Sequence, residues 1–418
     1  MVKTTKIPKD WEINTIESLA ANEKYAIKRG PFGGSLKKEI FVSSGYKVYE
    51  QKNAIKDDFD IGTYYITEKK FNELKAFAVK KGDVIISCSG TFGKAAIVPS
   101  SAKPGIINQA LLKITLNKNK ILPGYFKYFF DSKTVQNEFA KLTYGSAIKN
   151  VTSVGFIKKM KVPTPPIETQ KRIISIIEAA RETITLREKA YELTNQLLQS
   201  AFLDMFGDPL VDKRPFPLIR LGSLGNGEKR DIRFGPFGSQ LKINELTEEG
   251  IQVLGIENIG INQFINTKRK CITQEKYQQL KGFSVFPGDV IVTGMGTVGR
   301  VCVIPVGYPL SIISSHLFKI SLNLSKANPV YIASSIAYSP YIKKQVENEA
   351  HGAIMDGLNT TILKNLELYL PSIELQNKFA KMLEQVKAAM EEQEKSRQEI
   401  ENLFNALQQK AFTGELVT

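Results

Sequence analysis

An internal repeat constrains this chain more than any other feature of its sequence. Gly30-Pro31-Phe32-Gly33 returns 205 residues later as Gly235-Pro236-Phe237-Gly238, and Gly82-Asp83-Val84-Ile85 returns 206 residues later as Gly288-Asp289-Val290-Ile291. Further pairs in this register are Lys94 with Arg300, Pro99 with Pro305, Lys113 with Lys319, Tyr125 with Tyr331, and Gln170 with Gln376. A match kept over about 140 residues, from Gly30 to Gln170, predicts two tandem copies of one structural unit.

Each copy ends in a stretch with the pattern of a long amphipathic helix. Seam positions recur in steps of three, four and seven, and charged residues occupy the other faces. In residues 168–202 they are Ile173, Ile177, Ala180, Ile184, Tyr191, Leu198 and Ala201, and in residues 374–412 they are Phe379, Leu383, Val386, Met390, Arg397, Ile400, Phe404, Leu407 and Ala411. Prolines precede both stretches, at Pro166 and Pro371. The pattern predicts two long helices that pair along a heptad seam.

The blocks before these helices mix strand and helix signals. Short β-branched runs bounded by Gly or Pro predict strands within 83–90, 94–99 and 109–116, and again within 289–296, 300–305 and 315–322. Residues 123–142 and 329–350 have helical spacing. The predicted fold class is therefore α+β, with two globular blocks that are each followed by a long helix.

The repeat also predicts how the halves are arranged. We expect one block at 1–167, its helix at 168–205, a second block at 206–373 and its helix at 374–418. Duplicated halves usually pack about a two-fold axis, which makes the helices an antiparallel coiled coil with pseudo-two-fold symmetry. A helix of about 35 residues spans ~50 Å, more than one turn of duplex DNA at ~3.4 Å per base pair. The helices therefore resemble a spacer between the blocks.

The net charge of +15 is concentrated in the globular blocks. Residues 1–167 carry 28 Lys and Arg against 14 Asp and Glu, a net charge of +14, and residues 206–373 carry a net charge of +4. The helices at 168–205 and 374–418 carry −1 and −2. This distribution favours a polyanionic partner such as nucleic acid, and solubility alone is the alternative.

The remaining composition favours a folded cytoplasmic protein. No apolar run reaches the ~18 residues of a membrane helix, and the N-terminus shows no apolar segment of a secretory signal. Cys88, Cys271 and Cys302 lack metal-binding spacing and fit reduced thiols.

Two segments resemble motifs of cofactor binding or catalysis, but each lacks a feature that the motif requires. Gly294-Met295-Gly296-Thr297-Val298-Gly299 matches GxGxxG, but the following residues predict a strand where the dinucleotide fingerprint needs a helix. Thr164-Pro165-Pro166-Ile167 lacks both the polar first residue and the aromatic last residue of the amino-methyltransferase motif, so a proline at a helix start explains it better.

The histidines and the repeated aspartates also give no evidence of a catalytic or metal site. His316 and His351 have no metal spacing and no partner in the first copy. Asp83 and Asp289 follow a glycine at a strand start, which fits turn capping better than catalysis. We therefore expect a chain that is not an enzyme, with no metal site.

The remaining candidate chemistry is DNA recognition. Glycines let backbone N–H groups approach phosphates, Lys and Arg supply charge, and amides and hydroxyls read base edges. A purely structural turn is the alternative for the glycine-rich segments. The candidate DNA-binding residues are Lys28, Arg29, Ser35, Lys37, Lys38, Thr91, Lys94, Asn108, Gln109, Tyr144, Lys149 and Asn150 in the first copy, and Arg233, Ser239, Lys242, Thr297, Arg300, Ser315, His316, Met355 and Asn359 in the second.

Together these features resemble the specificity subunit of type I restriction–modification enzymes over essentially the whole chain. The resemblance is carried by the GPFGGSLK and GPFGSQLK segments, by GDVIISCSGTFGKAAIVP and GDVIVTGMGTVGRVCVIP, and by the helix starts PPIETQKRI and PSIELQNKF, which lead to QSAF and QKAF. It implies two target-recognition domains, each reading one half of a bipartite DNA site, with the helices setting the gap.

The resemblance also implies partners. The chain would be non-catalytic and would recruit two adenine-methyltransferase subunits and, in the full complex, restriction subunits. S-adenosylmethionine, ATP and Mg would belong to those partners, with no cofactor on this chain. A methylation-only or phage-defence system and a two-armed protein scaffold are the alternatives. An enzyme acting alone lacks its motifs here.

Overall fold

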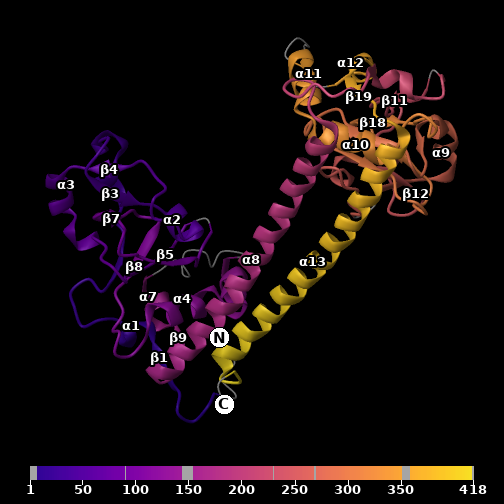
Figure 1. The fold of residues 1–418 in the computed structure, drawn as a ribbon. Helices are drawn as coiled ribbons and strands as arrows, with labels where there is room; N and C mark the ends of the chain where they lie inside the picture. Colours follow the sequence, from indigo (N-terminus) through magenta and orange to yellow (C-terminus); the bar gives the residue numbers. More distant parts are fainter. Residues whose placement is uncertain are drawn as a thin grey trace. The chain divides into compact units, whose positions relative to one another are not determined.

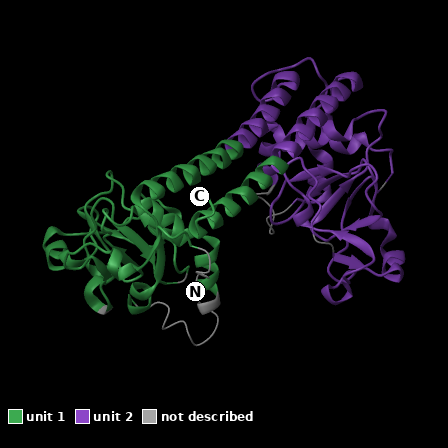
Figure 2. Ribbon diagram, turned by 90° about the horizontal axis from the view of Figure 1, so that it is seen from below, with its two compact units in different colours: residues 1–188, 395–418 green, residues 189–394 purple. Residues whose placement is uncertain are grey.

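The computed structural model describes residues 7–89, 91–143, 154–228, 230–267, 270–350 and 358–416. The chain divides into two compact units, which Figure 2 colours separately: unit 1 comprises residues 1–188 and 395–418, and unit 2 comprises residues 189–394. Within the described ranges no helix is long and apolar enough to cross a membrane.

Unit 1 is built around a four-stranded antiparallel sheet in the order β2–β8–β5–β6. A second sheet has the order β4–β3–β7, with β3 parallel to β7, and β1 pairs with β9. The strands are β1 Glu12–Thr15, β2 Ile27–Arg29, β3 Tyr46–Tyr49, β4 Tyr65–Ile66, β5 Val84–Ser87, β6 Ala95–Ile97, β7 Gly105–Ile107, β8 Leu111–Ile114 and β9 Lys161–Thr164. The shorter helices are α1 Ile16–Leu19, α2 Gln51–Lys56, α3 Glu68–Glu73, α4 Pro123–Asp131, α5 Lys133–Thr143 and α7 Val154–Lys159 (Figure 1).

Unit 2 repeats this plan. Its sheets have the orders β11–β18–β15–β16 and β13–β12–β17–β14, and β10 pairs with β19. The strands are β10 Leu218–Arg220, β11 Ile232–Phe234, β12 Ile251–Leu254, β13 Lys270–Ile272, β14 Ser284–Val285, β15 Val290–Thr293, β16 Val301–Val303, β17 Ser311–Ile313, β18 Leu317–Ile320 and β19 Glu367–Tyr369. The shorter helices are α9 Gln274–Leu280, α10 Pro329–Tyr338, α11 Pro340–Ala350 and α12 Thr360–Asn365. The predicted strands of both copies are confirmed, and each predicted helical stretch is helical but divided into two helices.

The central sheet of each unit is buried on both faces. Successive side chains of a strand point to opposite faces, and in β5 Val84 and Ile86 join one apolar cluster whereas Ile85 joins another. In β15 Val290 and Val292 are likewise separated from Ile291. Coverage of both faces explains why these strands are continuous apolar runs instead of alternating ones.

Two long helices complete the fold, α8 Ile167–Phe206 and α13 Ile373–Thr413. Unit 1 contains the beginning of α8 and the end of α13, and there Ile173, Ile177 and Phe412 share one apolar cluster. Unit 2 contains the end of α8 and the beginning of α13, where Phe202 and Phe379 pack with ring centroids 5.5 Å apart. Because the beginning of each helix lies beside the end of the other, the pair is antiparallel, as expected for duplicated halves that pack about a two-fold axis.

A buried aspartate organises the start of the central hairpin in each copy. Asp83 accepts hydrogen bonds from Lys80 N at 2.9 Å and from Thr115 Oγ1 at 2.6 Å. Asp289 accepts them from Phe286 N at 2.8 Å and from Ser321 Oγ at 2.7 Å. Burial raises the pKa of both carboxyl groups. The carboxyl groups are engaged in turn capping, which the sequence favours over catalysis.

The GxGxxG match in unit 2 is a tight turn between two strands. Gly296 and Gly299 have φ values of +75° and +85°, a region that side chains with a Cβ rarely adopt. The next element is strand β16 and not a helix. This excludes the dinucleotide-binding fold at this motif.

The first glycine of the repeated Gly-Pro-Phe-Gly motif is required by close approach. A Cβ at Gly30 would lie 1.8 Å from the Asn108 carbonyl oxygen, and one at Gly235 would lie 1.9 Å from the Ser314 carbonyl oxygen. A Cβ at Gly238 would meet no atom within 4 Å. The same motif therefore contains one position that tolerates no side chain and one that does.

We expect Gly30→Ala to lower the free energy of unfolding by about 1–3 kcal/mol, because the backbone must move to relieve the overlap. Gly238→Ala is the control and should leave it within about 0.5 kcal/mol, as surface substitutions usually do. Urea unfolding followed by circular dichroism measures both. Equal stability of the two variants would contradict the close approach seen at Gly30.

Candidate nucleic-acid interface

Strand direction brings three loop segments of unit 1 together. β2 and β5 both run antiparallel to β8. The last residues of β2 and β5 therefore lie beside the first residues of β8, on the side of the sheet where these strands join their loops. Gly30 N donates to Leu111 O at 2.9 Å, and Cys88 N donates to Ala110 O at 2.7 Å. We call this region the strand-end edge of unit 1; its described part comprises residues 29–38, 87–89, 91–94 and 108–110.

Unit 2 has the equivalent strand-end edge at residues 234–242, 293–300 and 314–316. Gly235 N donates to Leu317 O at 2.9 Å, and Gly294 N donates to His316 O at 2.8 Å. Leu358 N also donates to Gly294 O at 3.0 Å, which ties the residue before the α12 cap to this edge. The two copies therefore share a scaffold on which the side chains differ.

The turn between the hairpin strands is held by one hydroxyl in each copy. Ser87 Oγ donates to Thr91 O at 2.6 Å and accepts from Lys94 N at 3.0 Å. Thr293 Oγ1 donates to Thr297 O and accepts from Arg300 N at 3.0 Å. These bonds place Lys94 and Arg300 at equivalent turn positions, as the repeat predicts.

The strand-end edge of unit 1 is rich in cations. Lys37 and Lys38 are exposed, and Lys94 is half-buried. Arg29 Nε donates to Gln109 O at 3.3 Å, and its guanidinium lies 5.0 Å from the centre of the Phe32 ring. Lys28 lies on β2 just outside this edge, and its Nζ is 5.2 Å from the centre of the Phe77 ring. The structure thus gathers most of the predicted residues of the first copy.

In unit 2 the cations are fewer and one has an internal partner. Arg233 Nη1 donates to Gly282 O at 2.9 Å, and the guanidinium lies 3.9 Å from the centre of the Phe283 ring. Burial lowers the pKa of this guanidinium. Lys242 and Arg300 are exposed. Arg233 therefore stabilises the unit, whereas Lys242 and Arg300 face solvent.

Several predicted polar residues form local hydrogen bonds. Asn108 Oδ1 accepts from Ala110 N at 3.0 Å, and Ser35 Oγ donates to Phe32 O at 3.3 Å. Asn359 Oδ1 accepts from Ile362 N at 2.9 Å and so caps α12. Ser315 Oγ lies 3.4 Å from His316 Nδ1. These bonds fix the loop conformations from which the exposed groups project.

The other predicted residues are exposed, half-buried or outside the described ranges. Thr91, Gln109 and Ser239 are exposed, and Thr297 is half-buried. Tyr144, Lys149, Asn150 and Met355 lie outside the described residues.

Two residues at the strand-end edges were not predicted from the sequence. Phe32 and Phe237 are 65% and 67% exposed at matched positions of the repeat. The signal that could have found them is the repeat itself, because both copies keep a phenylalanine at the third position of the same Gly-Pro-Phe-Gly motif.

Chemistry other than recognition has little support in the described part of the chain. No group of three or more His, Cys, Asp or Glu is placed to hold a metal ion there. Burial raises the pKa of the Cys88 thiol to about 11, so this cysteine at the edge is a poor nucleophile.

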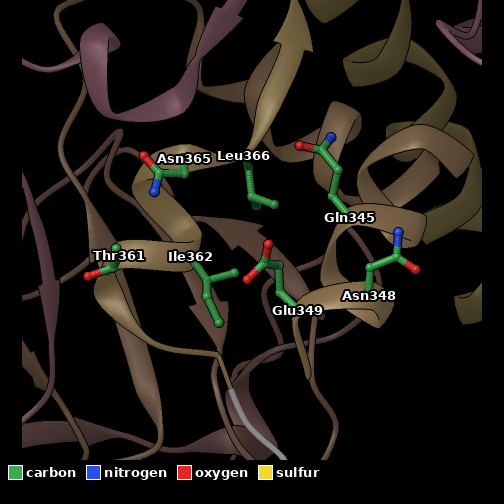
Figure 3. Close-up of a pocket in the computed structure, with 7 residues that line it drawn as sticks. All are labelled: Gln345, Asn348, Glu349, Thr361, Ile362, Asn365 and Leu366. Carbon is green, nitrogen blue, oxygen red and sulfur yellow. The ribbon is translucent and has the colours of Figure 1, made fainter. Parts of the chain in front are cut away.

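A hollow in unit 2 is shown in Figure 3, with a volume of about 190 Å³. It lies between α11 and α12 and is lined by Gln345, Asn348, Glu349, Thr361, Ile362, Asn365 and Leu366. Small-molecule sites usually enclose about 300–1,000 Å³. Gln345 is also engaged, since it donates to Glu367 O at 2.9 Å and accepts from Glu367 N at 2.8 Å. The hollow is therefore too small and too polar for a typical ligand site.

Comparison with known proteins agrees with this geometry. The family described as "Type I restriction modification DNA specificity domain" matches residues 8–196 and 241–402. The putative type I restriction enzyme MjaX specificity subunit of Methanocaldococcus jannaschii is 24% identical, over 98% of this chain and 95% of its own length. The EcoBI specificity subunit of Escherichia coli is 24% identical, over 80% of this chain and 73% of its own length.

Solved structures show the same fold. A chain from a type I R-M system structure superposes with a TM-score of 0.64 at 19% identity, over 98% of this chain and 100% of the other. The type I S subunit of M. genitalium gives a TM-score of 0.52 at 16% identity, over 99% of both chains. Since the family matches most of the sequence and the fold agrees over nearly all of it, this chain belongs to the type I restriction–modification DNA specificity subunits, the family that recognises DNA targets.

Proposed function

We propose that this chain reads a bipartite DNA target, with the strand-end edge of each unit contacting one half-site. The observation that carries this proposal is one scaffold present twice with different side chains at matched positions. Unit 1 has Arg29, Lys94 and Gln109 where unit 2 has Phe234, Arg300 and Ser315. Cations position a protein on phosphates, and differing amides and hydroxyls read different base edges.

The same proposal assigns the chemistry to other subunits. The chain recruits two adenine-methyltransferase subunits and, in a full complex, restriction subunits, all in the cytoplasm. S-adenosylmethionine, ATP and Mg bind to those partner subunits and not to this chain. Family membership supports the partner subunits. The cytoplasmic location is supported by Cys88, Cys271 and Cys302, whose thiols are free and buried. A methylation-only defence system would use the same chain without restriction subunits.

The first test is methylome sequencing of host DNA after co-expression of this chain with its methyltransferase subunit. We expect methylated adenines in a two-part motif with a fixed gap. Expression of the methyltransferase alone is the control and should give no such motif. DNA binding without a motif or methylation would instead favour a scaffold or a non-specific binder.

Replacing Lys94 or Arg300 by alanine should weaken binding through one half-site each. Losing one phosphate contact reduces the slope of log K against log salt by about 0.9, and weakens binding by about tenfold or less. Lys69→Ala, at an exposed position of α3, removes the same charge outside the edge and serves as the control. Binding to duplexes altered in one half-site gives the readout. A loss spread over both half-sites would argue against separate reading by the two units.

The length of the long helices should set the unread gap. Inserting four residues, about one helical turn, near Ala190 in α8 should lengthen the gap and leave both half-sites unchanged. The same insertion after Val306, which is 95% exposed in a turn of unit 2, is the control and should leave the gap as it is. Methylome sequencing of each variant measures the gap. An unchanged gap in the Ala190 variant would disprove the spacer role.

A further inference from the structure

An exposed phenylalanine stands at the strand-end edge of each unit. Phe32 and Phe237 leave about two thirds of their surface in water, although apolar surface is ordinarily favoured in the interior. Scattered exposed apolar residues are common and need no explanation. These two differ because they occupy the same position in both copies of the repeat.

The backbone under each ring is fixed. Gly30 and Pro31 are buried directly before Phe32, as are Gly235 and Pro236 before Phe237. Gly30 and Gly235 are held where no Cβ fits, against the Asn108 and Ser314 carbonyls. Each ring therefore projects from an anchored base.

Local hydrogen bonds fix each turn after the ring as well. Ser35 Oγ donates to Phe32 O at 3.3 Å. Gln240 N donates to Phe237 O at 2.7 Å, and Phe237 N donates to Gln240 Oε1 at 3.1 Å. A backbone that is already held in place loses little conformational entropy on binding, which favours the use of the ring it carries as a contact.

The surroundings of the rings indicate the chemistry of the partner. In unit 1 the exposed Lys37 and Lys38 follow Phe32, and the Arg29 guanidinium lies over its ring. In unit 2 the exposed Lys242 follows Phe237, whose ring lies 5.8 Å from that of Phe234. An apolar ring among cations matches a DNA groove, where phosphates line the rim and sugars, base edges and thymine methyl groups form the floor.

We propose that Phe32 and Phe237 are apolar DNA contacts, one for each half-site, whose rings enter a groove between the phosphates held by the neighbouring cations. This inference rests on the proposed function and adds to it two residues that carry no charge. Each ring packs against sugars and base edges, so it contributes affinity that salt does not screen.

The test uses the complex of this chain with its methyltransferase subunit and a fluorescent duplex that carries the motif mapped by methylome sequencing. Phe32→Ala and Phe237→Ala should each weaken binding about five- to fiftyfold, with the salt slope unchanged. Each should also remove discrimination at one half-site only, a different one for each variant. Lys37→Ala is the matched control from the same segment and should lower the salt slope. Phe32→Trp should keep most of the affinity.

Other results would overturn the inference. Unchanged affinity of both alanine variants would exclude the DNA contact while leaving the proposed function intact, since wild-type binding is measured in parallel. Loss of methyltransferase assembly with retained DNA binding by the chain itself would make these rings a protein contact instead. Absence of specific binding by the wild type would refute the proposed function, and this inference with it. The melting temperature separates these outcomes from misfolding, because removing an exposed ring should not change it.

Discussion

A buried glutamine at the start of each long helix fixes that helix to its unit. Gln170 is fully buried, accepts a hydrogen bond from Leu122 N at 2.8 Å, and donates to the carbonyls of Lys120 and Pro165. Gln376 accepts from Asn328 N at 2.8 Å and donates to Pro371 O at 2.9 Å. Each side-chain amide thus hydrogen-bonds the backbone just before α4 or α10, and it also bonds a proline carbonyl in the turn that leads into the long helix. A hydrophobic residue there would leave these groups unpaired, at about 1–3 kcal/mol each.

The strands beside this glutamine also connect each long helix to its block. β9 and β19 lead directly into α8 and α13, and they pair with β1 and β10, which begin the blocks. The start and end of each block are thereby joined beside the helix. The loops at the strand-end edge carry no part of this frame, so their side chains can differ while the fold is kept. The net charges of +14 and +4 show how far the blocks have diverged.

The sequence predicts the elements with strong patterns and misses those fixed by tertiary contacts. The hairpin of β5 and β6 and the heptad helices are confirmed because their apolar patterns are long or continuous. The second sheet was not predicted, since β4 has two residues and β3 pairs with the distant β7. The helical stretches are each broken, at Ser132 and Ser339, whose hydroxyls accept from Val135 N and Ile342 N. The dipeptide Ser339-Pro340 is a helix-start signal that could have predicted the second break.

In the candidate site, too, sequence patterns predict some features and tertiary contacts determine the others. The repeat predicts that Lys94 and Arg300 lie at equivalent turns, and the structure places them so. It does not predict that Arg233 contacts Gly282 and Phe283, because that contact depends on a neighbouring turn 49 residues away in the chain. The sequence of one copy alone also does not show whether Phe32 is a core residue. The exposure of its ring depends on the packing of the buried Gly30 and Pro31 that precede it. Sequence pattern thus identifies which loops meet, whereas packing decides which of their side chains remain exposed.

The exchange of helix ends makes each unit depend on residues from the other half of the repeat. Phe412, near the end of α13, packs against Tyr125 and Phe129 in unit 1, with ring centroids 5.4 Å apart in each case. Phe206, at the end of α8, packs 4.8 Å from Tyr331 in unit 2. Burying a phenylalanine contributes about 1.5–3 kcal/mol, a large part of a typical stability of about 5–15 kcal/mol. The first block therefore completes its core only with the last helix of the chain.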